Sequence, residues 1–566
     1  MDSQSVYNKA RDALKQWNEQ LKSRILRSNS CLMHSYSILF ADDLQFIEQL
    51  KQFANRVAAE LEPVVAENNL NENLPELSQF NSIGERHDRV IHHPSYVQAG
   101  DIIYSTGLME FLRHPGQMKK TLALFILSSH AGEAGHNCPI ACSAGIIRIL
   151  TKSPLKNNDF YMEKLLAPSF THNFTGAQFL TEIQGGSDVG ANATIAFQDE
   201  KKSWRIVGEK WFCSNANADL ILLTARTNPQ ASGTKGLSLF MVPAKLDDDT
   251  DNRYKLRRLK QKIGTRSMAT AEIDFEGALA YLIGNANDGI HLVMENVLHL
   301  SRLFNAFSVL GMTRRAYQIA YYYACNREAF GRKIIAYPLV KEHLARIKAD
   351  LMAMLASSFH MVDLQDSFDS KSENAIDEKQ KYLLRTLANL NKYFTAKHAV
   401  EHIHHCLDVL AGNGTIESFS SLPRLLRDCI VCENWEGTHF TLWMQILRDI
   451  LRFEVDEIFL DHLRSLLEKI KKTRYKELFN KQIISLKTHF IFLKSLSNEQ
   501  QTLHIKEIVE KMAALMAAIS LAIEVQQGKP PIAKKACLDL FIQSYFLEKE
   551  NGEQYLKLLE TIFAQE

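Results

Sequence analysis

A block of strand-like sequence lies inside a chain whose other segments all follow the periodicity of helices. Up to about residue 175, apolar residues recur at helical spacing, as in segments 43–61 and 119–129. After Phe179 the pattern changes to short runs rich in β-branched and aromatic residues, divided by turn-forming residues. Helical spacing returns at Gly289 and continues almost to the end of the chain. The four strand-like runs are 204–207, 220–225, 237–243 and 271–275.

The second helical part is long enough for a bundle and for a further block after it. Helical segments are predicted over 289–327, 337–366 and 378–410, then over 451–478, 481–496, 500–527 and 533–563. A loop rich in Asn and Pro is predicted over 68–81. The chain has 566 residues, which is too long for a single domain built around one hydrophobic core. We therefore expect a mainly α protein with a small central β domain, divided into domains 1–178, 179–285, 286–449 and 450–566.

Composition indicates an ordinary soluble protein. The net charge of +1 does not suggest a polyanionic partner. The nine scattered cysteines are typical of reduced thiols in a cytosol-like compartment. The first 27 residues lack an apolar signal core, the apolar stretches 122–127 and 512–523 are too short to span a bilayer, and Ala564-Gln565-Glu566 is not a peroxisomal address. These features predict a cytoplasmic protein without a membrane span.

Glu436 is the leading candidate for a catalytic group. It lies in the sequence Asn434-Trp435-Glu436-Gly437-Thr438, between an aromatic ring and a glycine. Such a carboxylate can be held half-buried, and burial raises the pKa of a carboxyl group toward the range of a useful base. Taken alone, the same sequence also suits an ordinary glutamate in a turn.

The segment Thr181-Glu182-Ile183-Gln184-Gly185-Gly186-Ser187-Asp188 lies where helical spacing gives way to strands. Its glycines allow the backbone to approach a bound ring or phosphate, and its hydroxyls can bind the polar edge of a cofactor. A glycine-rich turn capped by Ser187 and Asp188 is the alternative interpretation.

The segment 208–215 places Phe212 and Ser214 two residues apart, on one face of a predicted strand. A ring and a hydroxyl in that arrangement could cover a planar cofactor and bind its edge. A core aromatic residue beside a hydrogen-bonded serine would give the same pattern.

Two helix ends add further candidates. Arg327, in Asn326-Arg327-Glu328-Ala329-Phe330-Gly331-Arg332, could bind a pyrophosphate, although a cation there also complements a helix dipole before Gly331 ends the helix. The second is Leu410-Ala411-Gly412-Asn413-Gly414, which ends a helix and leads to Glu436.

In their order and spacing these motifs resemble the acyl-CoA dehydrogenase family over about residues 80–450. Within that family the chain is most similar to the alkylation-response branch. The supporting residues are the Gln-Gly-Gly-Ser-Asp-Val run from Gln184, the Lys-Trp-Phe-x-Ser run from Lys210, Pro338 where most members have glutamine, segment 89–94 and Cys138-Pro139. The resemblance implies a helical N-terminal domain, a β-barrel middle domain and a helical bundle, with an extra helical C-terminal domain after them.

The resemblance also implies FAD as cofactor and roles for individual residues. Thr181 would bind the flavin pyrimidine edge, Phe212 would cover the flavin, and Ser214 would lie near its reactive nitrogen. Arg327 would reach the FAD pyrophosphate across a subunit boundary, which implies a homo-oligomer, a dimer or tetramer. The remaining cofactor contacts implied are Phe179, Ser187, Cys213, Phe330, Gly412, Gly414, Trp435, Gly437 and Thr438. Ser187, His299 and Arg302 would contact the substrate.

The implied reaction is dehydrogenation of an acyl-CoA in fatty acid metabolism, with Glu436 as base and electrons passed to an acceptor such as electron-transfer flavoprotein. Departures from the family pattern occur at His299, Asp408, Ala411 and Phe440. Two alternatives remain open. One is a flavin-containing, DNA-binding protective protein like that of the alkylation-response branch, and the other is an acyl-CoA oxidase.

Two other clusters have ordinary interpretations that we prefer. His398, His402 and His405, with Cys406 beside them, have the spacing of metal ligands, but we predict a partly exposed helix face and no metal. The basic run from Lys469 to Arg474, with Lys476 and Lys481, could meet phosphates, but nearby acidic residues favour a solvated helix face.

Overall fold

The computed structural model describes residues 3–23, 25–27, 30–371, 377–548 and 551–564. Gln565 and Glu566 lie outside these ranges. They are the last two residues of the C-terminal tripeptide that was compared with a peroxisomal address. The chain forms two compact units. Unit 1 comprises Met1–Ala59, Ser129–Ala131 and Asn305–Glu566, and unit 2 comprises Glu60–Ser128 and Gly132–Phe304. The division into four domains stays a prediction.

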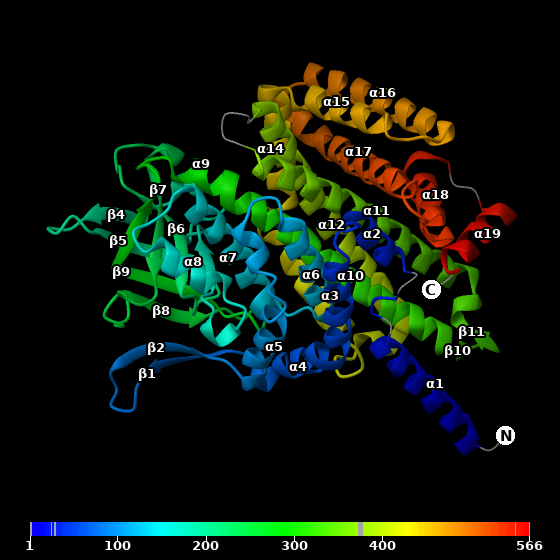
Figure 1. The fold of residues 1–566 in the computed structure, drawn as a ribbon, viewed down its shortest axis with the longest axis horizontal. Helices are drawn as coiled ribbons and strands as arrows, with labels where there is room; N and C mark the ends of the chain where they lie inside the picture. The colour runs from blue at the N-terminus through cyan, green and yellow to red at the C-terminus, as the bar shows by residue number, and fades with distance from the viewer. Residues whose placement is uncertain (1–2, 24, 28–29, 372–376, 549–550, 565–566) are drawn as a thin grey trace. The chain divides into compact units, whose positions relative to one another are not determined.

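Unit 2 contains a β-barrel, seen among the cyan and green strands of Figure 1. β6 pairs with β4 and β7, β7 with β9, β9 with β5, and β5 with β4, so these strands close into a ring. β3 extends the sheet beyond β6, and β8 pairs with β9. The strands are β3 (Gly176–Phe179), β4 (Ile195–Gln198), β5 (Trp204–Ser214), β6 (Leu220–Arg226), β7 (Leu237–Pro243), β8 (Tyr254–Leu259) and β9 (Thr270–Ile283). The four predicted strand-like runs and the predicted barrel are confirmed.

The barrel interior is filled by alternate side chains of its strands. Ile206, Phe240 and Ile273 are fully buried in this core. β6 and β7 are buried along almost their whole length, which explains why they are apolar without alternation. The structure therefore has a packed barrel rather than an open one.

The helices of unit 2 precede the barrel in sequence, except for the last. They are α4 (Glu62–Asn68), α5 (Pro94–Tyr104), α6 (Met118–Ala131, with its last three residues in unit 1), α7 (Ala134–Lys152), α8 (Asn158–Leu166) and α9 (Gly289–Val293). The predicted loop over 68–81 is wrong in its second half, because β1 (Glu76–Phe80) pairs with β2 (Arg86–Ile91) as a hairpin. Both strands are mostly exposed and polar, so apolar alternation did not mark them.

Over the part of unit 1 that the structure describes, the chain is helical apart from one short hairpin. Its helices are α1 (Ser3–Ser23), α2 (Cys31–Leu39), α3 (Leu44–Arg56), α10 (His299–Asn326, with its first six residues in unit 2), α11 (Pro338–Asp369), α12 (Glu378–Leu410), α13 (Leu422–Asn434), α14 (His439–Phe453), α15 (Val455–Leu467), α16 (Thr473–Ser495), α17 (Asn498–Glu524), α18 (Ile532–Phe546) and α19 (Glu553–Ile562). The hairpin consists of β10 (Glu328–Ala329) and β11 (Arg332–Lys333). The predicted mainly α fold is confirmed.

Two predicted helices after residue 450 are divided in the structure. Segment 451–478 is interrupted at Glu454, whose φ of 51° is left-handed and ends α14, and again between α15 and α16. Segment 533–563 contains two helices, α18 and α19. Periodicity alone missed these breaks because apolar spacing resumes after each of them. In Figure 1, α15, α16 and α17 lie alongside one another near the top of the view.

The core of the bundle in unit 1 joins residues that are remote in sequence. Trp17, Tyr323, Ile347, Ile403 and Cys429 belong to one buried cluster. The indole Nε1 of Trp17 donates to the main-chain oxygen of Ile319 at 3.0 Å, which satisfies the polar atom of a buried ring. This cluster packs α1, α10, α11, α12 and α13 together.

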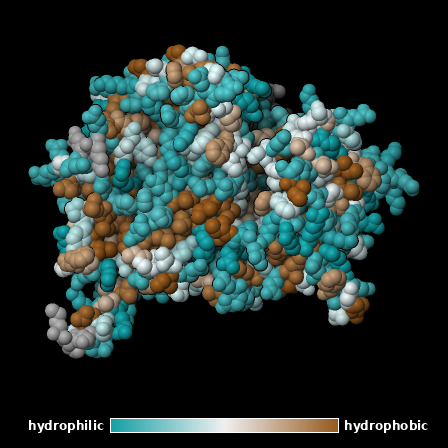
Figure 2. Space-filling view, turned by 180° about the vertical axis from the view of Figure 1, so that it is seen from behind, coloured by the Kyte–Doolittle hydropathy of each residue, from teal (hydrophilic) through white to brown (hydrophobic). Residues whose placement is uncertain are grey.

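The surface is mixed in polarity. Figure 2 shows hydrophilic residues over most of the visible face, with hydrophobic residues in separate patches. Among the described residues, none of the helices combines the length and hydropathy that crossing a membrane requires.

Candidate active site

Glu436 lies in a tight turn between α13 and α14. Its φ is 58° and that of Gly437 is 108°, so two consecutive residues have left-handed backbone conformations. Such a conformation is unfavourable for a residue with a side chain and persists where the surroundings impose it. The Glu436 side chain is half-buried, as the sequence predicted.

A buried lysine on α12 holds this turn. Lys392 is fully buried, and its Nζ donates to the main-chain oxygens of Glu433 at 2.8 Å and Gly437 at 2.7 Å. These carbonyls lie on either side of Glu436, so one ammonium group binds both ends of the turn. Hydrogen bonds to a charged group in a buried setting are among the stronger ones in proteins. The left-handed conformation of Glu436 is therefore imposed by tertiary contacts.

Two further contacts fix the residues that flank Glu436. The indole Nε1 of Trp435 donates to Oδ1 of Asn305. The hydroxyl of Thr438 caps α14 by accepting from the main-chain N–H of Thr441 at 3.3 Å. The turn is thus bound at its start, its middle and its end.

A second carboxylate lies close to the turn. Burial raises the pKa of Glu433, and the nearby Lys392 ammonium opposes that effect in part. His439 lies 3.8 Å from Glu433, measured from Nε2 to Oε1. Burial, together with Lys392 and Lys397, lowers the pKa of His439 to about 4. At neutral pH His439 is therefore an uncharged imidazole beside the turn.

In unit 2, the glycine-rich segment after β3 is organised by Glu182. This buried carboxylate accepts from Lys210 Nζ at 2.7 Å and from the main-chain N–H of Ala193 at 2.6 Å. Burial raises the pKa of Glu182, but the Lys210 ion pair and the hydrogen bonds outweigh that effect and lower it. At Gly186 a Cβ would lie 2.4 Å from the Thr181 hydroxyl oxygen, which accounts for a glycine there. Thr181 is half-buried and Ser187 is exposed.

β5 presents a ring and a hydroxyl beside a local irregularity. The register with β9 shifts between Lys210 and Cys213, so Phe212 lies in a bulge. Phe212 is 53% exposed. The Ser214 hydroxyl lies 3.1 Å from that of Thr270, and Lys260 Nζ lies 4.9 Å from the centre of the Phe212 ring. An exposed ring with a hydroxyl and a cation nearby fits one face of a planar, electron-accepting cofactor such as a flavin.

Two of the predicted cofactor contacts face the barrel core. Phe179 and Cys213 are both fully buried there. Burial also raises the pKa of the Cys213 thiol well above its usual range. Their side chains are therefore core residues, and only their main-chain atoms remain as candidates for cofactor binding.

The remaining predicted contacts in unit 1 lie at helix ends. Arg327 is exposed just after α10, and Phe330, 97% exposed with a φ of 50°, forms the tip of the β10–β11 hairpin. A Cβ added at Gly412 would meet nothing within 4 Å, so its backbone is open to a ligand. A Cβ at Gly414 would lie 2.4 Å from the Leu407 main-chain oxygen, so packing alone explains that glycine.

The predicted substrate residues on α10 are both buried, His299 being 8% exposed and Arg302 4%. They project from adjacent turns of the helix within unit 2. Ser187, by contrast, is exposed in its loop. The structure therefore presents the three residues in different environments.

Three segments of the chain match models of known protein domains. Residues 177–278 match the middle domain of acyl-CoA dehydrogenases and residues 287–451 match their C-terminal domain. Residues 16–171 match the N-terminal domain of the adaptive response protein AidB. The putative acyl-CoA dehydrogenase AidB of Escherichia coli is 32% identical over 392 residues, which are 67% of this chain and 69% of that protein. The chain belongs to the acyl-CoA dehydrogenase family.

Another sequence relative supports this membership, and two solved structures share the fold. Acyl-CoA dehydrogenase family member 11 of Caenorhabditis elegans is 30% identical over 420 residues, 70% of this chain and 66% of that protein. The solved structure called Bd2924 apo-form superposes with a TM-score of 0.76 at 25% identity, covering 90% of this chain and 96% of that one. The Caenorhabditis elegans ACDH-11 structure, in complex with C11-CoA, superposes with a TM-score of 0.79 at 23% identity, covering 94% of this chain and 91% of that one.

Family membership makes this chain an oxidoreductase of the acyl-CoA dehydrogenase type, with FAD as its cofactor. The predicted likeness to the alkylation-response branch is confirmed by the match to the AidB N-terminal domain. The three matched segments end at residue 451, so they leave the additional helices α15 to α19 unassigned.

Several residues that shape the site were missed from the sequence. Lys392 and Asn305 lie within long helices, with no local motif to mark them, and they act only through contacts with the Glu436 turn. Lys260 follows β8 and reaches the rings of β5. None of these contacts is visible without the tertiary structure.

The histidine run on α12 also differs from its prediction. His398 and His402 are 6% and 4% exposed, so the expected partly exposed face is wrong for these two residues. The prediction agrees with the structure for His405, which is half-buried with its ring centre 4.3 Å from that of His343. The basic run has acidic partners, since Lys476 binds Glu468 at 3.0 Å.

Proposed function

We propose that this protein dehydrogenates an acyl-CoA between its α and β carbons, with Glu436 as the base. The observation that supports this proposal most directly is the conformation of Glu436. A half-buried carboxylate is held in a left-handed turn by hydrogen bonds from Lys392 to both flanking segments. Strain of that kind, maintained by a buried cation, is typical of functional positions.

In this reaction the Glu436 carboxylate takes a proton from the α carbon of the acyl thioester. The main-chain N–H of Glu436 donates a hydrogen bond to the thioester oxygen, which stabilises the charge that develops there. When bound, FAD supplies the acceptor for the hydride that leaves the β carbon. The Cα–H electron pair then forms the new double bond, and the product is a trans-2-enoyl-CoA.

Residues proposed to contact FAD occur in each unit taken by itself. In unit 2 these are Thr181 and Ser187, with Phe212 and Ser214 against the flavin ring and the main chain of Phe179 and Cys213. In unit 1, Trp435, Gly437 and Thr438 would bind the flavin side, and Gly412 and Gly414 the adenosine half. Arg327 and Phe330 would reach the cofactor of a neighbouring subunit in a dimer or tetramer. Their exposure supports that role.

The substrate proposal rests on α10 and on one relative. His299 and Arg302 would bind polar groups of the CoA arm, with Ser187 beside it. ACDH-11 of Caenorhabditis elegans has been solved in complex with C11-CoA, and we propose an acyl-CoA substrate for this chain as well. Electron-transfer flavoprotein is the proposed acceptor, which places the reaction in fatty acid metabolism.

Anaerobic titration of the purified holoprotein with acyl-CoAs of increasing chain length tests this function. We expect one class of acyl-CoA to bleach the visible absorption of the flavin, because bleaching reports reduction by substrate. Air should restore the colour slowly if the protein is a dehydrogenase and rapidly if it is an oxidase. Absence of bleaching by every acyl-CoA, with a DNA mobility shift at physiological salt, would instead support the DNA-binding alternative.

A further inference from the structure

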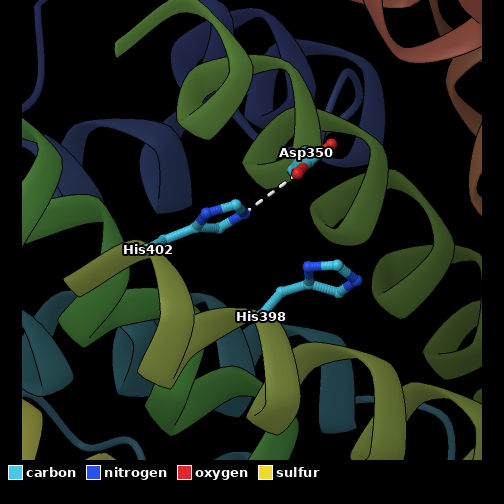
Figure 3. A group of neighbouring side chains, drawn as sticks. All are labelled: Asp350, His398 and His402. Carbon is cyan, nitrogen blue, oxygen red and sulfur yellow. Dashed lines mark ion pairs between the residues drawn. The ribbon is translucent and has the colours of Figure 1, made fainter. Parts of the chain in front are cut away.

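Three buried side chains in unit 1 converge at one point between α11 and α12. His398 and His402, four positions apart on α12, project from the same face of that helix. Asp350 lies opposite them on α11, and Figure 3 shows both imidazoles on the side of α12 that faces it. One ligand atom from each of the three residues lies within 4.8 Å of the other two. Their exposed fractions are 7% for Asp350, 6% for His398 and 4% for His402.

The spacing suits a single metal ion. Nε2 of His402 lies 3.0 Å from Oδ2 of Asp350. Two atoms that each bind a zinc ion at about 2.1 Å can be no more than about 4.2 Å apart. The 4.8 Å within which all three ligand atoms lie is close to that limit. Two imidazoles and one carboxylate are a common ligand set for Zn²⁺ and other divalent transition metals.

Nitrogen atoms of both histidines are free of hydrogen bonds within the described part of the chain and could therefore bind a metal ion. Nδ1 of His398 and Nδ1 of His402 are buried and have no hydrogen-bond partner among the described residues. Nε2 of His402 lies near Asp350 without the alignment of a hydrogen bond. Buried polar atoms are nearly always paired, so orphaned nitrogens beside a carboxylate need an explanation, and a bound cation is one.

Groups around the three residues are placed like the outer contacts of a metal site. Nε2 of His398 lies 3.3 Å from the hydroxyl of Tyr545 on α18 and 3.8 Å from Oε1 of Glu510 on α17. A ligating histidine usually has its second nitrogen bound to such a partner, which fixes the ring. Glu401 lies 3.6 Å from Nδ1 of His398. The surrounding carboxylates would also favour a cation.

We propose that Asp350, His398 and His402 bind one divalent transition-metal ion. The ion joins α11 to α12 directly, and Tyr545 and Glu510 connect it to α18 and α17. Residues beyond 451 therefore complete the surroundings of the site, which gives the additional C-terminal helices a function in holding the bundle together. The site is separate from the Glu436 turn, and its existence does not depend on the proposed dehydrogenase reaction.

Zinc binding to the full-length holoprotein tests this site. Elemental analysis is made on the protein as purified, and Zn²⁺ is titrated calorimetrically into protein treated with a chelator. We expect one equivalent of metal per chain and a higher melting temperature with Zn²⁺. The variants are His402→Gln, Asp350→Asn and Tyr545→Phe. His404→Gln serves as the matched control, since His404 is exposed on the same helix.

The expected affinities separate a metal site from a simple ion pair. His402→Gln and Asp350→Asn should weaken Zn²⁺ binding by about 100-fold or more, and Tyr545→Phe by about tenfold. His404→Gln should bind as the parent protein does. Circular dichroism and FAD content identify any variant that fails to fold. If a ligand variant does not fold, the Zn²⁺ affinity of Tyr545→Phe, which keeps all three ligands, tests the site instead. The proposal is overturned if the parent binds no stoichiometric Zn²⁺, or if the folded ligand variants bind it as tightly.

Discussion

Lys392 shows how one buried charge can determine the geometry of the turn that contains Glu436. Its ammonium group donates to the main-chain oxygens of Glu433 and Gly437, on either side of Glu436. Replacing it with a side chain of similar shape but no charge leaves two carbonyls without their donor. A buried acceptor that loses its partner costs about 1 to 3 kcal/mol.

We therefore expect Lys392→Met to lower the free energy of unfolding by about 2 to 4 kcal/mol. The rate of flavin reduction by substrate should fall as well, because the Glu436 backbone would relax from its left-handed conformation. Chemical denaturation and anaerobic stopped-flow measurements check the two effects. Lys379→Met, an exposed change on the same helix, should alter neither. A Lys392→Met protein that reduced its flavin at the parental rate would show that the turn does not need this lysine.

Residues of this kind mark the limit of inference from sequence. Glu436, Phe212 and Ser214 could be selected because each belongs to a local motif with a fixed order along the chain. Lys392 and Asp350 could not, because each acts on residues of another helix or turn and has ordinary neighbours in sequence. Their functions depend on tertiary contacts alone.

At the scale of elements, the backbone is strained directly after the end of α12. Ala411, which follows the helix, has a φ of 52° and a ψ of −135°, a conformation suited to glycine. Alanine is therefore unfavourable at this position, because its Cβ conflicts with this backbone conformation. The following segment holds Gly412 and Gly414 in one turn of 3₁₀-helix.

Ala411→Gly should consequently raise the free energy of unfolding by about 1 kcal/mol, because glycine adopts this conformation without steric cost. Thermal unfolding of the holoprotein checks the change, which should appear as a higher melting temperature. Ala388→Gly, at a buried position inside α12 where the backbone is helical, should instead lower stability by at least about 1 kcal/mol, because the buried methyl group is lost as well. Equal effects at the two positions would contradict strain at Ala411.

Element boundaries were predictable where the apolar period changed, and less so elsewhere. The predicted strand run over 237–243 coincides with β7, and the segment 378–410 coincides with α12. The β1–β2 hairpin was missed because its strands are polar and exposed. The break at Glu454 was missed because a left-handed residue other than glycine or asparagine gives no local signal.

At the scale of the whole molecule, several buried histidines link stability to pH. His136 is fully buried in unit 2, and its Nε2 donates to the main-chain oxygen of Tyr96 at 2.8 Å. Burial lowers its pKa to about 4, although Glu133 and the bond to Tyr96 oppose that effect. Burial likewise lowers the pKa of His360 to about 3 and that of His462 to about 4. The folded protein keeps all three neutral where the unfolded chain would protonate them.

A histidine whose folded pKa lies below its unfolded value of about 6.5 destabilises the fold as pH falls through that interval. Above pH 6.5 the histidine is neutral in both states and the fold keeps its full stability. The free energy of unfolding then falls with pH until about pH 4, where the folded protein is protonated as well. For His136 alone the loss is about 3 kcal/mol. Unfolding free energies measured from pH 7 to pH 4 should therefore decline less steeply in His136→Gln than in the parent protein. His172→Gln, an exposed control, should keep the parental slope, and parallel curves for all three proteins would contradict this linkage.

The central claim is that Glu436, rather than the neighbouring Glu433, removes the substrate's α proton. Both are half-buried acidic residues, Glu433 near the end of α13 and Glu436 in the turn that follows it, so each serves as the control for the other. The decisive measurement is the anaerobic rate of flavin reduction by the preferred acyl-CoA in Glu436→Gln and Glu433→Gln, each with its normal content of FAD. We predict a fall of about 100- to 10,000-fold in Glu436→Gln and a change within about threefold in Glu433→Gln. Near-parental reduction in Glu436→Gln would contradict the claim.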